Sequence, residues 1–294
     1  MKKVFTLTLS ALLVLSLLAG CGCSSTKDTQ SSGDSTGAAD STETAESTET
    51  TTLKVGASIT PHAEILAQCK PILAEQGIDL EVVEYTDYVQ PNTAVEDGDL
   101  DANYFQHVNY LNWFNADYNT HLVNACTVHY EPFGIYAGKV SALADLKDGD
   151  EIGVPNDGSN ETRALLLLQQ EGIITLKDGI TAASNATVQD IASYNVKVTI
   201  REMEAAQLTL SLPDLAVAVI NGNYALQGGL NAATDALATE AADGDAAQEY
   251  ANILAVKEGR ESDPAILALV DALHSDTVRD FINDTYSGAV VPLF

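Results

Sequence analysis

Residues that could bind a small molecule gather at three places where a predicted strand ends. The first place is Tyr88, the second is the run from Asn103 to Tyr110, and the third is the run from Pro155 to Arg163. In open α/β sheets a ligand lies beyond the carboxyl ends of the strands, so binding residues are expected at such places. Rings, amides and a guanidinium are groups suited to holding a ligand.

The run that ends at Arg163 has the clearest chemistry. Asp157 or Ser159 can cap a helix there, which places Arg163 near the amino end of that helix. A guanidinium beside free helix-terminal N–H groups suits a carboxylate. From local sequence alone, the alternative is an ion pair between Arg163 and Glu161 or another surface acid.

The other candidate residues have two interpretations each. Phe105, His107 and Tyr110 follow a predicted strand over 100–104, where the rings could wall an apolar pocket and His107 could add a polar contact. Aromatic residues after a strand are also ordinary core residues. Asn221 and Asn223 follow a predicted strand over 215–220, and their amides could hold an ammonium and a carboxylate or serve a turn.

Patterns typical of catalysis or metal binding do not occur in the sequence. It contains no Ser-His-Asp order, no phosphate-binding glycine loop and no paired-cysteine metal motif. His62, His121, His129 and His274 lack metal-ligand spacing, so each is expected at the surface or in the core. We therefore expect a protein that is not an enzyme and that has no catalytic residues, no metal and no cofactor.

The elements that position these residues alternate between strand and helix from Leu53 to Phe294. Such alternation predicts an α/β fold with mainly parallel sheets covered by helices. Two segments, 129–137 and 251–256, are aromatic or β-branched and could link two halves of the chain. We therefore expect one lobe from 53–138 and 248–294, a second lobe from 139–247, and a ligand cleft between them. The other predicted strands are 53–57, 79–85, 100–104, 151–155, 196–201 and 215–221, and the predicted helices are 61–76, 91–98, 110–115, 160–171 and 205–210.

The amino-terminal residues are typical of an exported lipoprotein. Lys2 and Lys3 precede an apolar stretch over 4–18, and Leu18-Ala19-Gly20-Cys21 fits a cleavage and acylation site. Residues 1–20 are therefore predicted to be a signal peptide, with an uncleaved anchor or an ordinary signal as the alternative. Acylated Cys21 would hold the protein on the extracytoplasmic face of a membrane. Residues 21–52 have almost nothing large and apolar to bury, which predicts a disordered acidic tether.

Charge and the remaining cysteines restrict the possible partners. The formal net charge of −28 makes nucleic acid and anionic lipid poor partners. Cys69 and Cys126 could form a disulfide in an exported protein or remain buried free thiols, and their spacing does not decide between these states.

Several stretches of the sequence resemble the methionine-binding lipoproteins of the NlpA/MetQ family, in the family's order along the chain. They are 84–92 (EYTDYVQPN), 100–107 (LDANYFQH), 154–157 (VPND), 160–168 (NETRALLLL), 204–208 (EAAQL) and 218–225 (AVINGNYA). The resemblance spans 53–294 and implies a two-lobed, type II periplasmic-binding-protein-like fold that closes over a free amino acid. It also implies delivery of that amino acid to the permease and ATPase subunits of an ABC importer.

Carried over by position, the resemblance implies a role for each candidate residue. Tyr88, Phe105, His107 and Tyr110 would form an aromatic slot for the ligand side chain. Arg163 would take the carboxylate, while Asn160, Asn221 and Asn223 would orient the α-carboxylate and the α-ammonium. This sequence departs from the family pattern at Gly158, where a proline is usual, and at Gly222, where a threonine is common.

L-methionine is the expected ligand. D-methionine, a methionine-containing dipeptide and a metal ion remain alternatives. A secreted hydrolase would need a nucleophile–base pattern that is missing from the sequence, and a surface adhesin would be compatible with transport.

Overall fold

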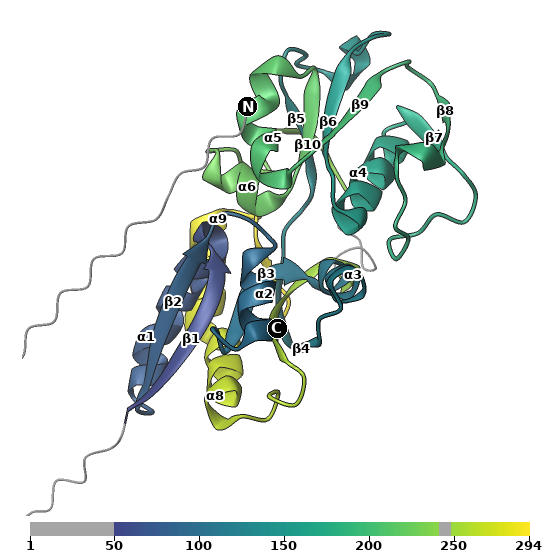
Figure 1. Ribbon diagram of the computed structural model, residues 1–294. Helices are drawn as coiled ribbons and strands as arrows, with labels where there is room; N and C mark the ends of the chain where they lie inside the picture. The colour runs from purple at the N-terminus through teal and green to yellow at the C-terminus, as the bar shows by residue number, and fades with distance from the viewer. Residues whose placement is uncertain (1–49, 241–247) are drawn as a thin grey trace, which may run out of the picture. The chain divides into compact units, whose positions relative to one another are not determined.

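Two β-sheets lie in separate halves of the computed structural model, which describes residues 50–240 and 248–294 (Figure 1). Residues 50–130 and 251–294 form the half that contains β1–β3, and residues 134–239 form the half that contains β5, β6 and β10. Residues 1–20, Cys21 and the tether up to residue 49 lie outside the described residues. Their predicted roles remain predictions.

The first sheet has six strands in the order β13-β4-β12-β3-β1-β2. The strand β1 pairs in parallel with both β2 and β3, whereas β12 is antiparallel to β3 and β4. All six residues of β3 are buried, as expected for a central strand covered on both faces. The strands are β1 (Thr51–Ser58), β2 (Ile78–Tyr85), β3 (Ala102–His107), β4 (Leu122–Tyr130), β12 (Ala251–Lys257) and β13 (Val291–Pro292).

The second sheet has five strands in the order β11-β5-β10-β6-β9. Its centre is the fully buried run VAVI of β10, whose β-branched residues favour extended backbone. The strands are β5 (Gly134–Ala137), β6 (Glu151–Pro155), β9 (Thr199–Met203), β10 (Val217–Ile220) and β11 (Ala236–Thr239); a separate antiparallel pair joins β7 (Ile174–Leu176) to β8 (Ile191–Tyr194).

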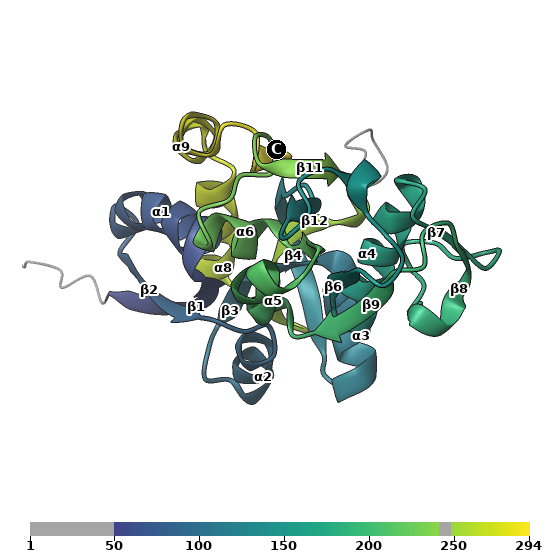
Figure 2. The same ribbon diagram turned by 90° about the horizontal axis from the view of Figure 1, so that it is seen from above.

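Helices accompany both sheets (Figure 2). The helix α1 contacts α8 and α9, and its buried residues Ile65, Leu66 and Leu73 share one apolar core with the first sheet. Leu165 and Leu168 of α4 belong to a separate core with the second sheet. The helices are α1 (Glu64–Ala74), α2 (Gln90–Asp97), α3 (Val108–Tyr118), α4 (Gly158–Gln170), α5 (Ala205–Ser211), α6 (Gly222–Gln227), α8 (Pro264–Leu273) and α9 (Asp276–Tyr286). No helix within 50–240 or 248–294 is long and apolar enough to span a membrane.

The chain crosses between the sheets twice. The first crossing segment is 131–133, between β4 and β5, and the second crossing lies between β11, which ends at Thr239, and β12, which begins at Ala251. The sequence analysis predicted one strand over 129–137 and a first lobe up to residue 138. That boundary is wrong by a few residues, because β5 pairs with β10 and β11 of the second sheet. The boundary predicted at 247/248 falls beside the segment that the structure does not describe.

The predicted fold class is confirmed, and the sheets are more mixed than the alternating pattern indicated. Antiparallel pairing enters through β12 in the first sheet and β5 in the second. These are the first strands after each crossing segment. The strand β1 begins at Thr51, two residues before the predicted start of the folded region.

Candidate ligand-binding site

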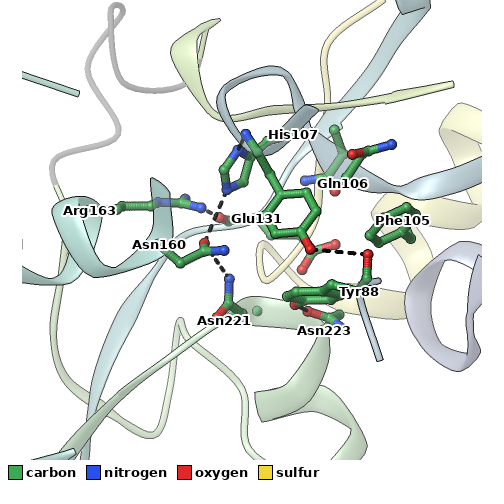
Figure 3. Close-up of a pocket in the computed structure, with 12 residues that line it drawn as sticks. Tyr88, Phe105, Gln106, His107, Glu131, Asn160, Arg163, Asn221 and Asn223 are labelled. Atoms are coloured by element: carbon green, nitrogen blue, oxygen red, sulfur yellow. Dashed lines mark hydrogen bonds between the residues drawn. The ribbon is translucent and has the colours of Figure 1, made fainter. Parts of the chain in front are cut away.

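A pocket with a cavity volume of about 20 Å³ lies between the two sheets. Figure 3 shows side chains from both lobes turned toward this space. All eight residues that the sequence analysis singled out line it, together with four that it did not. The lining residues are Tyr88, Phe105, Gln106, His107, Tyr110, Glu131, Asn160, Arg163, Asn221, Gly222, Asn223 and Asn252.

Aromatic rings form the wall on the side of the first sheet. The ring centroid of Tyr88 lies 5.6 Å from that of Phe105 and 5.6 Å from that of Tyr110. The Tyr110 hydroxyl donates to the Tyr88 backbone carbonyl at 3.1 Å, which fixes the loop before α2 against α3. Burial raises the pKa of Tyr88 well above its ordinary value, so this ring presents a neutral phenol to the pocket.

His107 connects this aromatic wall to the polar side chains opposite. It ends β3 and caps α3, and its Nδ1 accepts the backbone N–H of Tyr110 at 3.0 Å. The proton therefore sits on Nε2, which donates to Oδ1 of Asn160 at 3.1 Å. Burial, with the nearby charge of Arg163, lowers the pKa of His107 to about 3, so the ring is neutral at physiological pH.

Amides form most of the wall on the side of the second sheet. Asp157 caps α4 and accepts from both the backbone and the side-chain nitrogen of Asn160. Asn221 donates to Oδ1 of Asn160 at 2.8 Å, and Asn223 accepts from the Tyr88 hydroxyl at 2.5 Å. Oδ1 of Asn221 and Nδ2 of Asn223 are buried without a hydrogen-bond partner in the part of the chain that the structure describes. The pocket thus holds one unpaired acceptor and one unpaired donor.

Arg163 is buried at the edge of the pocket. Its Nε donates to Glu240 at 2.9 Å, and its Nη2 donates to the backbone carbonyl of Glu131 at 3.0 Å as well as to Glu240. The expected alternative of a surface ion pair is therefore wrong, because the partner acid is itself buried. Although burial alone would lower the pKa of Arg163, the charge and hydrogen bonds of Glu240 raise it above the ordinary value.

Glu131 is the acid that lines the pocket, and the sequence analysis missed it. His129 donates from Nε2 to Oε1 of Glu131 at 2.8 Å, and Nε2 of His62 lies 3.4 Å from the same oxygen. The backbone N–H of Asn223 also bonds to this carboxylate. Burial raises the pKa of Glu131, against the opposing effects of His62 and Arg163. The only local signal was the pair His129-x-Glu131 at the end of a buried strand.

The two imidazoles and this carboxylate form a cluster that spacing did not predict. Oxygen or nitrogen atoms of His62, His129 and Glu131 lie within 4.8 Å of one another. Burial lowers the pKa of His62 to about 4 and that of His129 to about 3, so both rings are neutral. The hydroxyl of Tyr104 bonds to Nδ1 of His129, and Asn252 bonds to Nε2 of His62 at 3.0 Å. This set has donors suited to a divalent metal, and it equally suits the holding of one carboxylate.

The two departures from the family pattern have a steric reason in this structure. A Cβ atom at residue 222 would lie 2.6 Å from Oε2 of Glu131, so glycine allows that carboxylate to approach the start of α6. A Cβ atom at residue 158 would lie 2.8 Å from Nε1 of Trp113 on α3. Gly158 therefore leaves room for the indole of Trp113.

The family assignment follows from a match over the whole folded region. A family model described as NlpA lipoprotein matches residues 53–294. The chain belongs to the NlpA lipoprotein family. This confirms the resemblance seen in the sequence, and it confirms a family of binding lipoproteins rather than of enzymes.

Relatives of known name or structure agree in sequence and in fold. The methionine-binding lipoprotein MetQ of Bacillus subtilis (strain 168) is 40% identical over 245 residues, covering 81% of this chain and 87% of the relative. A nutrient-binding protein from Burkholderia cenocepacia, solved bound to methionine, is 42% identical with a TM-score of 0.79, covering 82% of this chain and 100% of the other. A periplasmic substrate-binding protein of an ABC transporter from Coxiella burnetii is 39% identical with a TM-score of 0.76, covering 82% and 100%.

Cys69 and Cys126 are both free thiols in the structure. Burial, together with the neighbouring Cys126, raises the pKa of Cys69 to about 12, and burial raises that of Cys126 to about 12. Such thiols are poor nucleophiles, so a core role fits them better than a reactive one.

Proposed function

We propose that this protein is a lipid-anchored, extracytoplasmic substrate-binding protein of an ABC importer and that it binds L-methionine. The observation that carries the proposal is the pair of unpartnered amide atoms, Oδ1 of Asn221 and Nδ2 of Asn223, in a pocket that also contains Arg163 and Glu131. A buried polar atom without a partner costs free energy, and a ligand that satisfies it regains that energy. One acceptor and one donor beside opposite charges suit a zwitterion.

The two charged ends of an amino acid have complementary groups here. In the proposed complex the carboxylate takes N–H groups from Arg163 and from Nδ2 of Asn223. The α-ammonium donates to Glu131 and to Oδ1 of Asn221. Hydrogen bonds to charged groups contribute roughly 1.5–3 kcal/mol each, so four of them are enough to select a free amino acid.

The aromatic wall would receive the side chain of the ligand. Tyr88, Phe105 and Tyr110 present ring faces and edges around one apolar space. Burying a methionine-sized side chain contributes roughly 1.5–3 kcal/mol, and each sulfur–aromatic contact adds roughly 0.3–1.5 kcal/mol. A thioether is therefore favoured over an aliphatic side chain of similar size.

Among the methionine forms, the geometry favours the free amino acid over a dipeptide. A peptide bond would replace one charged end of the ligand, leaving either Arg163 or Glu131 without its counterpart in a buried site. The relatives named for methionine support this ligand class. D-methionine carries the same charged groups and remains the second candidate.

The buried cluster of His62, His129 and Glu131 is the observation that favours a metal ion instead. Without a metal, however, His129 can donate from Nε2 to Glu131, and the Tyr104 hydroxyl can donate to Nδ1 of His129. Nε2 of His62 can donate to Oδ1 of Asn252 and lies 3.4 Å from the same Glu131 oxygen. The network is then consistent with an ionised carboxylate held ready for an ammonium. We therefore assign the cluster to ammonium binding.

Membrane attachment and transport rest on the family and on the amino-terminal sequence. The chain belongs to a lipoprotein family, and Cys21 is the residue we propose to be acylated. One relative is named as the substrate-binding protein of an ABC transporter. We propose that the permease and ATPase of such a transporter are the partners, and that a bound amino acid stabilises the closed arrangement of the lobes.

Titration calorimetry on protein that has been unfolded, freed of small molecules and refolded tests this function. We expect L-methionine to bind at micromolar affinity or tighter, which is about −8 kcal/mol. N-acetylmethionine and methionine amide each lack one charge and should bind at least about tenfold more weakly. Zinc that stabilises the protein against heat, without any effect of methionine, would support the metal alternative and contradict this proposal.

A further inference from the structure

Glu240 contacts the pocket only through Arg163. It follows β11, its side chain is buried, and it is not among the residues that line the pocket. Its carboxylate receives two N–H groups of the guanidinium, from Nε and from Nη2. The other terminal nitrogen, Nη1, takes no part in these bonds.

The same carboxylate is tied to the first crossing segment. Oε1 of Glu240 accepts the hydroxyl of Tyr130 at 2.5 Å and the backbone N–H of Phe133 at 3.1 Å. Tyr130 ends the last strand before the crossing, and Phe133 is the last residue of the crossing segment itself. Glu240 thus connects the guanidinium to the segment where the chain passes between the lobes.

Aromatic rings and a carbonyl fix the remaining sides of the guanidinium. Its central carbon lies 4.1 Å from the ring centroid of Tyr250 and 4.7 Å from that of Phe133. Tyr250 directly precedes β12, at the end of the second crossing. Arg163, which belongs to α4 of the second lobe, is therefore in contact with both crossing segments.

We propose that Glu240 is the positioning residue for ligand-carboxylate recognition, acting through Arg163. This inference rests on the proposed function. A buried guanidinium without a counter-charge would be strongly unfavourable before ligand arrives, and Glu240 supplies that counter-charge. Its two-point contact through Nε and Nη2 also fixes the orientation of the guanidinium, so little orientational freedom is lost on binding. Because Glu240 is attached to the first crossing segment, the group that receives the ligand is fixed to the part of the chain about which the lobes move.

The test compares two ligands that differ only in the carboxylate. Affinities for L-methionine and L-methionine amide are measured by calorimetry in the wild type, Glu240→Gln and Tyr130→Phe. Glu240→Gln keeps the size of the side chain and removes its charge, whereas Tyr130→Phe removes one hydrogen bond to Glu240. Glu96→Gln, which alters a half-buried acid paired with His121 and Lys257 in the first lobe, is the control.

We expect the preference of the wild type for methionine over its amide to fall about tenfold in Glu240→Gln. The preference should fall by a smaller factor in Tyr130→Phe and stay unchanged in Glu96→Gln. If both Glu240 and Tyr130 variants weaken the two ligands by the same factor, Glu240 has only a structural role and the inference is wrong. Should Glu240→Gln fail to fold, the result for Tyr130→Phe decides.

A ligand-free measurement separates this inference from the proposed function. Urea unfolding of Arg163→Gln, Glu240→Gln and the double variant forms a double-mutant cycle. We expect the double variant to be less destabilised than the sum of the single variants, since each single change leaves one buried charge unpaired. Strict additivity would overturn the positioning role, whatever the wild type binds. A wild type that binds neither ligand while the cycle shows coupling would reject the proposed function instead.

Discussion

The two walls of the pocket differ in chemistry and in origin. The wall from the first lobe is built of rings, with Tyr88, Phe105 and Tyr110 in mutual contact. The wall from the second lobe is built of amides and one guanidinium. Asn160 and Arg163 are held by residues behind the pocket, whereas Asn221 bonds to Asn160 and Asn223 to Tyr88 within it. A ring wall selects by shape and polarisability, whereas a wall of directed donors and acceptors selects by charge. The division indicates that one lobe recognises the side chain and the other the charged ends of an amino acid.

The difference also extends to how each wall is kept in place. The rings hold one another through apolar contact, so the loss of one ring leaves a cavity. The polar groups depend on partners outside the pocket, such as Asp157 for Asn160 and Glu240 for Arg163. A change on the polar wall is therefore expected to leave an unpaired buried group, which is the more costly defect.

The largest effect is expected for Arg163→Ala, which removes the only cation of the polar wall. Losing one member of a desolvated charge pair costs roughly 2–5 kcal/mol, so methionine affinity should fall roughly thirtyfold to several-thousandfold. The free energy of unfolding should also fall by about 3–5 kcal/mol, since Glu240 would remain buried and unpaired. Calorimetry well below the melting temperature separates these two effects.

Arg201→Ala is the matched control for that variant. Arg201 makes an exposed ion pair with Glu151 at the edge of the second sheet, where such pairs contribute little. Near-native methionine affinity in Arg163→Ala would show that the polar wall does not hold the carboxylate, and the division between the walls would then be lost.

A second effect is expected on the aromatic wall from Phe105→Ala. This change removes one ring of the slot and leaves the groups for the charged ends in place. Methionine should lose a sulfur–aromatic contact that leucine never makes, so the preference for methionine over leucine should shrink roughly two- to tenfold. Competition calorimetry with both amino acids measures the ratio. An unchanged ratio accompanied by weaker binding of both would assign side-chain selection to another part of the pocket.

A third effect is a loss of folding stability at low pH. It is expected because His107, which joins the two walls, is buried as a neutral ring. Its pKa falls from the ordinary value of 6.5 to about 3 on folding. Between these two pKa values His107 is protonated in the unfolded chain and neutral in the folded protein. The free energy of unfolding therefore keeps its full value above pH 6.5 and falls, through His107, as the pH is lowered toward 3. At pH 5 the loss in free energy of unfolding that is due to His107 is about 2 kcal/mol.

Comparing His107→Gln with the wild type isolates the contribution of His107 to the pH dependence of the unfolding free energy. Raised pKa values at Glu131 and Asp157 act in the opposite sense and are present in both proteins. We expect the loss of unfolding free energy between pH 7 and pH 5, measured by urea titration, to be smaller in the variant. Equal losses would mean that His107 is already protonated or exposed, and that the walls are not joined by a neutral imidazole.

Local patterns were sufficient to predict the candidate ligand-binding residues that lie near strand ends. The strand predicted over 151–155 is β6, and Asp157 caps α4 as its type and position indicated. Asn221 could be placed because it follows the buried run of β10, and Arg163 because it lies early in the predicted helix. Phe105 was expected after a strand over 100–104, and the structure places it within β3. The structure brings them into one pocket, and their roles there remain proposals.

The partners behind the pocket could not be predicted, because they come from distant parts of the chain. Arg163 and Glu240 are separated by 77 residues, and His62 and Asn252 by 190. No local periodicity connects such pairs, and Glu240 follows a short strand, β11, that the sequence analysis did not identify. The histidine–glutamate cluster was missed for the same reason, since metal-type spacing is a local criterion.

The smallest effect is expected for Tyr88→Phe, at the point where the walls touch each other. The Tyr88 hydroxyl donates to Oδ1 of Asn223 at 2.5 Å, while the ring itself stays in the aromatic wall. Removing the hydroxyl leaves one amide acceptor without a partner and should weaken methionine binding roughly two- to tenfold. Selectivity for methionine over leucine should not change, since the ring remains. A change in selectivity with unaltered affinity for methionine would mean that Tyr88 acts through its ring alone, and that the two walls recognise the ligand without a link between them.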